Sequence, residues 1–152
     1  ESIDRLNEIK SSGRIFFTVG NMEYLKHGGR IGKVASVAGS LLGIKPIITL
    51  KEGEIFPSGI GRSRRKTVDK TIDLLLAYLA EEKTDIADYS ICIGYGYDKE
   101  EAVEFRDRLV SRLKEKEYDI DTIPIFQIGA TIGVHTGPYP LGIGVVKKSI
   151  RE

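Results

Sequence analysis

The stretch IGATIGVHTGPYPLGIGVV, from Ile128 to Val146, indicates much of the fold and carries the most informative polar group of the chain. It is apolar almost throughout, and it predicts strand, tight turn and strand, with the first strand bent or bulged at its glycines. His135 and Thr136 interrupt this pattern directly before Gly137. The imidazole needs an explanation, because burying it charged or unpaired costs free energy.

The segments on either side of this stretch alternate between predicted hairpins and helices. KPIITL, KEGE and IFPSG predict a hairpin, and RIFFTVG and YSICIGYG predict two further strands. Helices are expected at 2–12, at 67–82, after Asp98, and in the short segments MEYLKHGG and GKVASVAGSLLG. Because hairpins mix with crossovers, we expect an α+β fold: a mixed, mainly antiparallel sheet with helices packed on one face.

Length and composition exclude several classes of protein. The 152 residues fit one domain, 1–152, and a net charge of +1 gives no global field that would select nucleic acid. One cysteine, Cys92, excludes an internal disulfide framework and fits a reducing compartment, so we expect a cytoplasmic protein. No apolar run is long enough for a membrane span, and no signal peptide is visible. The chain starts Glu-Ser without Met, so we expect it to be a piece of a longer product.

Two basic segments are candidates for contacts to phosphate or to a partner. HGGRIGK resembles a phosphate loop only loosely, but its glycines permit a tight turn that exposes Arg30 and Lys33. GRSRRK places Arg62 and Arg64 just before a helix, where an acidic partner or a phosphorylated ligand is a better fit than nucleic acid. The alternative for both segments is a set of solvated cations.

Other chemistries lack their motifs. The GYG that ends at Gly96 has Lys99 where a dinucleotide fingerprint needs a third glycine. Two histidines and one cysteine show no metal-ligand spacing, and no Gly-x-Ser-x-Gly elbow occurs. We therefore expect neither a metal nor a cofactor, and we interpret Cys92 as a core residue.

His135 is the strongest candidate for a ligand contact. The turn at Gly137 and Pro138 can hold the imidazole and the Thr136 hydroxyl at a strand end, beside apolar flanks. An apolar surface with one or two fixed polar groups suits an amphiphile, whose tail lies on the apolar part and whose head contacts the polar groups. The alternative is a buried histidine with a structural role.

At this point the sequence resembles the C-terminal domain of the DegV family of bacterial fatty-acid-binding proteins. The resemblance covers essentially the whole chain. It is carried by YLKHGGRIGKVASVAGSLLGIKPIITLKEGEI, by RSRRK before a helix, and by IGVHTGP followed by LGIGVV. It implies that this chain is the C-terminal ligand-binding half of a two-domain protein, whose missing N-terminal domain supplies Ser and Thr hydroxyls. It also implies that a fatty acid kinase receives the bound acid and makes the acyl phosphate, and that the binding protein itself is not an enzyme.

The resemblance assigns roles to particular positions. His135, with Thr136 and Gly137, matches the turn that binds the fatty acid carboxylate, while Arg30 and the arginines of RSRRK match basic positions near the mouth of the site. The family usually has glycine and then a small residue after His-Thr-Gly-Pro, whereas this chain has Tyr139 and Pro140. Because of that departure at the head-group turn, the resemblance does not by itself identify which ligand this chain binds.

Three alternatives to fatty-acid binding are carried forward. The first is a binding module for another small amphiphile or metabolite that uses the same histidine. The second is a structural or partner-docking domain in which His135 is merely buried. An enzyme is the third, and it would need a nucleophile or a metal site that the sequence does not show.

Overall fold

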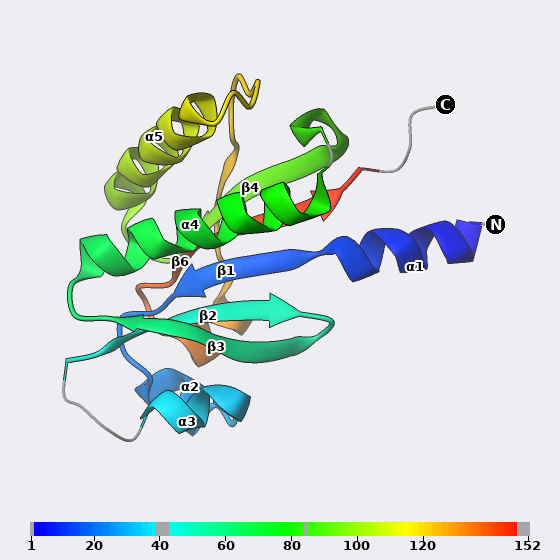
Figure 1. Ribbon diagram of the computed structural model, residues 1–152. Coiled ribbons are helices and arrows are strands. Elements are labelled where there is room, and N and C mark those ends of the chain that lie inside the picture. The colour runs from blue at the N-terminus through cyan, green and yellow to red at the C-terminus, as the bar shows by residue number, and fades with distance from the viewer. Residues whose placement is uncertain (1, 39–42, 84, 149–152) are drawn as a thin grey trace.

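The computed structural model describes residues 2–38, 43–83 and 85–148, which form a six-stranded sheet with helices around it (Figure 1). The order across the sheet is β3-β2-β1-β6-β4-β5, and β4 and β5 run parallel whereas the other described neighbours run antiparallel. The strands are β1 (Arg14–Thr18), β2 (Lys45–Lys51), β3 (Glu54–Gly61), β4 (Tyr89–Tyr95), β5 (Ile125–Gln127) and β6 (Leu141–Lys147).

The expected fold class, a mixed and mainly antiparallel sheet in an α+β domain, is confirmed. Helix α4 begins three residues before the predicted start, because the Ser63 hydroxyl accepts a hydrogen bond from the Lys66 amide. Asp98 caps α5 as predicted, with its carboxylate 2.9 Å from the Glu101 amide nitrogen. The helices are α1 (Ser2–Ser12), α2 (Glu23–His27), α3 (Ala35–Ala38), α4 (Arg64–Glu82), α5 (Lys99–Glu115) and α6 (Ala130–Thr136), with 3-10 turns η1 (Gly32–Val34) and η2 (Ile86–Asp88).

The predicted long strand before His135 is wrong. After the three residues of β5, the chain turns into helix α6, and His135 lies in the last turn of that helix. The apolar run IGATIGVH has no strict alternation, and runs of this kind fit a short helix as well as a strand. Part of the predicted second helix, residues 39–42, lies outside the described residues.

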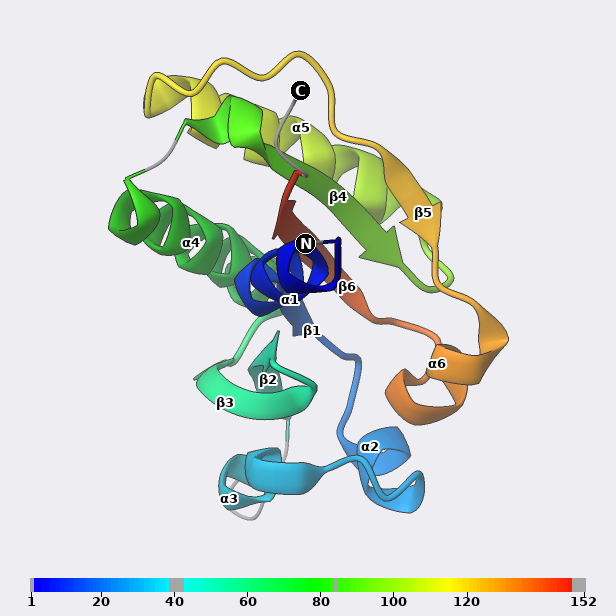
Figure 2. The ribbon, with the colours of Figure 1, turned by 90° about the vertical axis from the view of Figure 1, so that its right-hand side faces the viewer.

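The two faces of the sheet differ in how they are covered. Helices α4 and α5 lie on one face, and the large core cluster there is centred on residues such as Phe105, Leu75 and Ile143 (Figures 1 and 2). On the opposite face, the segment from α2 to η1 covers only one corner, where Leu25 and Val34 pack with Ile48. The expectation that helices pack on one face of the sheet is therefore right for the long helices α4 and α5. It is wrong for the short segment from α2 to η1, which lies on the opposite face.

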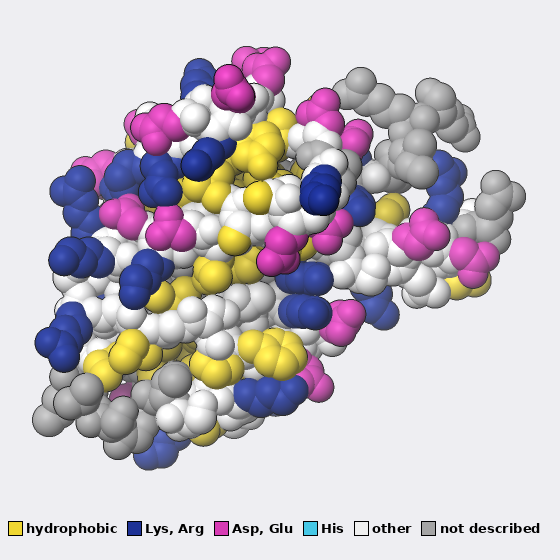
Figure 3. Space-filling view, in the orientation of Figure 1, with side chains coloured by type: hydrophobic (Ala, Val, Ile, Leu, Met, Phe, Trp, Pro, Cys, Tyr) yellow, Lys and Arg dark blue, Asp and Glu magenta, His cyan; other side chains and the backbone are white. Residues whose placement is uncertain are grey.

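A row of ion pairs joins α4 to α5 on the outer surface of the helix layer. The Arg64 guanidinium binds the Glu101 carboxylate through two hydrogen bonds, both of 2.8 Å, and the other two pairs are single contacts of 2.8 and 3.0 Å. Figure 3 shows alternating blue and magenta side chains along this surface. The three pairs are Arg64–Glu101, Arg108–Asp69 and Arg112–Asp73.

The buried Tyr78 hydroxyl gives a prediction about stability at alkaline pH. It donates a 2.8 Å hydrogen bond to the carbonyl of Ser12, and burial, followed by the nearby Tyr89 and Glu82, raises the pKa of Tyr78 to about 12. An unfolded tyrosine ionises near pH 10. The buried, neutral Tyr78 side chain therefore makes its full contribution to the free energy of unfolding below about pH 10. That contribution is lost as the pH rises toward 12.

The expected result is that the stability difference between the unsubstituted protein and Tyr78→Phe narrows as the pH rises over this range. Urea unfolding of both proteins at several pH values between 9 and 12 measures that difference. A difference that stays constant across the range would contradict the raised pKa.

Within the described residues, no helix is both long enough and apolar enough to cross a membrane. The longest, α4, has charged residues along its exposed side.

Candidate ligand-binding site

The uncovered face of the sheet contains an apolar groove with a volume of about 580 Å³. Strand pairing places Leu50, Ile15, Gly144 and Cys92 side by side in one row across four strands. Ile15 is 42% exposed, although it lies in the middle of the sheet. The volume falls in the range of small-molecule sites, and the lining is mainly apolar, as such sites require.

A second row, nearer α6, shapes the floor of this face. Phe17, Gly142, Gly94 and Phe126 are neighbours across β1, β6, β4 and β5. The two glycines keep the floor low between the two aromatic side chains. Phe126 is 59% exposed on its edge strand, so no described residue covers it from above.

Cys92, interpreted from the sequence as a core residue, is only half-buried and lies in the floor of the groove. Its side chain is half-buried and lines the groove beside Gly144. Burial raises the pKa of the Cys92 thiol above its ordinary value, so the group is a neutral thiol at physiological pH. A neutral thiol behaves as a small apolar side chain, which fits a groove for hydrocarbon.

His135 is held beyond the start of β6, at the end of the sheet opposite α1. Its Nδ1 atom is buried against Gly28, and no described residue donates to it or accepts from it. A methyl group at Gly28 would collide with the imidazole, so this glycine creates the space that the ring occupies. The ring is otherwise half-buried, which leaves part of it accessible to a ligand.

Thr136 and Gly137 fix the end of the helix that carries His135. The Thr136 hydroxyl is buried and lies 3.3 Å from the carbonyl oxygens of both Ile132 and Gly137. Gly137 has a φ of +74°, a region that favours glycine, and the Tyr24 ring packs directly over its Cα. In this geometry Thr136 holds the backbone, and of the three predicted ligand residues His135 has the accessible polar side chain.

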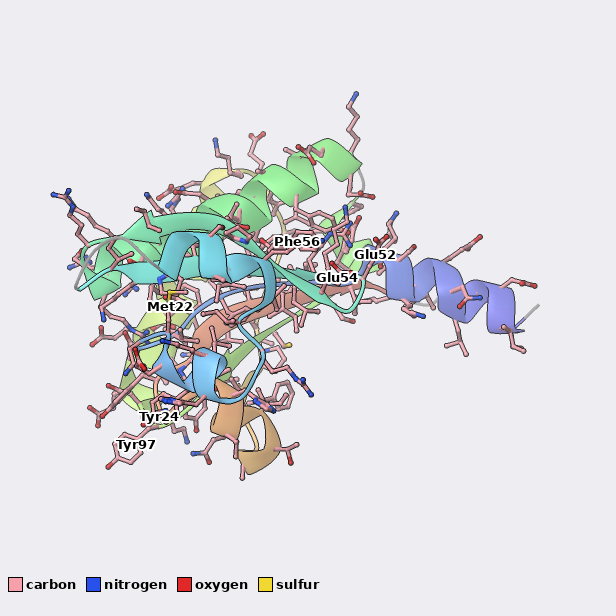
Figure 4. The ribbon with its side chains drawn as sticks, turned by 90° about the horizontal axis from the view of Figure 1, so that it is seen from below. Met22, Tyr24, Glu52, Glu54, Phe56 and Tyr97 are labelled. Carbon is pink, nitrogen blue, oxygen red and sulfur yellow. The ribbon has the colours of Figure 1, made fainter. Side chains whose placement is uncertain are left out.

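The four predicted basic contacts do not form one cluster with His135. Arg30 and Arg62 are exposed, and Arg30 follows Gly28, which lies against the imidazole, by two residues. Lys33 is paired with Glu54 at 2.6 Å, and its ammonium lies over the ring of Phe56 on the hairpin that Figure 4 shows from below. Arg64 is engaged by Glu101 in the helix layer.

Sequence reasoning missed the residues that shape the site. Gly28 and Tyr24 lie in the same basic segment as Arg30, but only the fold brings them to α6. Residues of the groove alternate along four separate strands, so the sequence does not show that they adjoin. Among the described residues, no group of three or more His, Cys, Asp or Glu side chains is placed to hold a metal ion.

The structure is thus an α+β domain with one helix-covered face, one open apolar groove and a histidine beyond one end of the sheet. The model of the family described as "Uncharacterised protein, DegV family" matches residues 1–148. The chain belongs to the DegV family.

Relatives with known sequences support the same assignment. Two DegV domain-containing proteins from Clostridium perfringens are 34% and 37% identical to this chain over 149 and 143 residues. These matches cover 97% and 94% of this chain but 50% and 47% of those proteins. The chain therefore spans about half the length of the curated relatives it matches.

Solved structures also share the fold. A stearic-acid-binding protein from Eubacterium ventriosum is 43% identical, with a TM-score of 0.87, and the match covers 97% of this chain and 49% of that chain. A DegV family protein from Thermus thermophilus, described for its fatty acid binding, is 26% identical with a TM-score of 0.82, and the match covers 96% and 49%.

Proposed function

We propose that this chain is the C-terminal, ligand-binding half of a cytoplasmic protein that holds a fatty acid. The observation that carries the proposal is the open apolar groove on the uncovered face of the sheet. Its lining lies toward the α1 end of the sheet, and the row of Phe17, Gly142, Gly94 and Phe126 lies between that end and the segment that carries His135. A hydrocarbon chain in the groove would remove Ile15, Leu50 and Phe126 from water, and each buried methylene contributes about 0.8 kcal/mol. The similarity to the stearic-acid-binding protein supports the same ligand class.

In this proposal the carboxylate binds at His135. Nδ1 faces Gly28 and is buried, so in this proposal the carboxylate meets the other ring nitrogen, Nε2. Thr136 and Gly137 hold that ring in place and do not themselves contact the head group. The hydroxyls that complete the carboxylate site come from the N-terminal half of the protein, as the family resemblance implies.

The protein binds and presents its ligand, and it does not transform it. The bound acid is offered to a fatty acid kinase, which phosphorylates the carboxylate that His135 holds. Arg30 and Arg62 are exposed and suit contacts to that kinase or to the acyl phosphate. Lys33 and Arg64 would first have to exchange their carboxylate partners, Glu54 and Glu101.

Lipid extraction from the purified full-length protein, followed by mass spectrometry, tests the ligand class. Fatty acid in a stoichiometric amount supports the proposal. If the protein releases another amphiphile, or takes up no fatty acid from a panel of chain lengths, fatty-acid binding is excluded.

A substitution at Cys92 tests whether the groove holds the hydrocarbon chain. Cys92→Phe would fill the groove from its floor, and an aromatic residue is well tolerated in a strand, so we expect the fold to remain and the affinity for long-chain acids to fall at least about tenfold. The control is Cys92→Ala, which removes the thiol and leaves the groove open. Equal affinities for the two variants, measured by titration calorimetry, would place the hydrocarbon elsewhere.

A further inference from the structure

Helices α2 and α6 lie side by side at the lower edge of the sheet in Figure 2, and each packs mainly against the other. They belong to segments more than a hundred residues apart in the sequence. The position of His135 therefore depends on how α6 is fastened to α2.

Two contacts join the helices, and in each of them an aromatic ring from one helix packs on the glycine that ends the other. The imidazole of His135, from α6, occupies the space above Gly28, which ends α2. In return, the Tyr24 ring, from α2, lies over Gly137, which ends α6. A Cβ atom built on Gly137 would lie only 3.0 Å from Cγ of Tyr24 and closer still to two other carbons of the ring.

The two glycines differ in what requires them: the φ of +74° at Gly137 already favours glycine, whereas the backbone at Gly28 does not. Gly28 has φ −76°, which any residue can adopt, so a side chain there is opposed by its neighbours: chiefly the His135 ring, and also the Tyr24 carbonyl oxygen, 3.1 Å from the position of a Cβ atom. The Tyr24 hydroxyl makes no hydrogen bond within the described residues, and the side chain is 42% exposed. Its contribution at this place is the flat face of its ring, which covers Gly137; Figure 4 shows it projecting from α2.

We infer that Tyr24 is a positioning residue for His135: the interlocked pairs Tyr24–Gly137 and His135–Gly28 hold the imidazole at the angle at which it meets the ligand head group. This inference rests on the proposed function. Tyr24 acts through Gly137 and through the last turn of α6, two residues from the imidazole, and does not touch the carboxylate. A ligand site needs such support, because a polar group that is free to move loses much of its advantage in binding.

Substitutions of Tyr24 in the full-length protein test the inference. Tyr24→Ala removes the ring over Gly137, and we expect the affinity for the fatty acid to fall about tenfold. Tyr24→Phe retains the ring, and we expect the affinity to be unchanged. The NMR signals of the His135 ring should broaden or shift in Tyr24→Ala and stay in place in Tyr24→Phe.

Gly28→Ala tests the other half of the attachment. The new methyl group would displace the imidazole, so we expect a lower melting temperature and weaker binding. In a His135→Ala background the new methyl group meets only the Tyr24 carbonyl oxygen, 3.1 Å away, so the same substitution should lower the melting temperature clearly less than it does with the imidazole present. Equal losses in the two backgrounds would mean that the effect does not pass through His135.

The outcomes separate the inference from the proposed function. If the unsubstituted protein retains no fatty acid, the proposed function fails. If it retains fatty acid and Tyr24→Ala binds as tightly with an unchanged His135 signal, the positioning role is overturned while the function stands. Equal losses in Tyr24→Phe and Tyr24→Ala would also overturn it, because the ring would then not be the group that matters.

Discussion

Replacing His135 with alanine is expected to weaken fatty acid binding by the full-length protein about 10- to 100-fold while the fold is retained. A hydrogen bond to a charged group contributes roughly 1.5–3 kcal/mol, which corresponds to that loss of affinity. The groove that we propose for the hydrocarbon stays intact, so residual binding of long chains is expected. Titration with fatty acids of several lengths measures the loss, and thermal unfolding checks the fold.

The second histidine of the chain provides the matched control. His27 ends α2, one residue before Gly28, and it is exposed, so His27→Ala should leave the affinity unchanged. A head-group role also predicts that His135→Ala costs the same factor for each chain length, because the hydrocarbon contacts are unaffected. A variant that binds every fatty acid as tightly as the unsubstituted protein would reduce His135 to a structural residue.

Replacing Gly142 with alanine is expected to destabilise the fold by about 3 kcal/mol or more. A Cβ atom at Gly142 would collide with the carbonyl oxygen of Phe16 and with the Cβ of Phe17 on the neighbouring strand. The first of these is backbone, which cannot move without disturbing the centre of the sheet. In a protein of this size the loss lowers the melting temperature by roughly 6–12 °C.

Gly144, two residues along the same strand, is the control for this substitution. A Cβ there meets the Cys92 sulfur at 3.2 Å, and that side chain borders the open groove and can give way. Gly144→Ala should therefore cost less than about 1 kcal/mol. Urea unfolding of both variants measures the difference in the free energy of unfolding. Equal losses of stability in the two variants would contradict the collision with the Phe16 carbonyl as the cause.

The sequence predicted best those elements whose signals are local. The hairpin from Lys45 to Gly61, the Asp98 cap of α5 and the amphipathic α4 each depend on a few neighbouring residues, and all were found. The segment 130–136 was predicted wrongly, because its apolar residues follow neither a clear strand period nor a clear helix period. In the fold this segment packs against α2, a contact that no local pattern in the sequence shows.

For the candidate site, too, the sequence predicted what depends on local patterns and missed what depends on contacts between distant segments. His135 was singled out as a polar residue in an apolar stretch, and the structure places it against Gly28 of the basic glycine segment. That prediction of its role remains to be tested. What no local pattern showed was the space that Gly28 makes for the ring, because the two residues are far apart in the sequence and carry no common period.

The row of ion pairs between α4 and α5 has a consequence for how these helices recognise each other. Read from the N-terminal end, α4 presents one cation and then two anions, while α5 presents one anion and then two cations. The two charge orders match only when the helices run in the same direction. In the reversed arrangement Arg64 would face Arg112, and Asp73 would face Glu101. The surface charges of this layer therefore favour the parallel docking of the two helices over the inverted one, in which two of the three attractive pairs become repulsive.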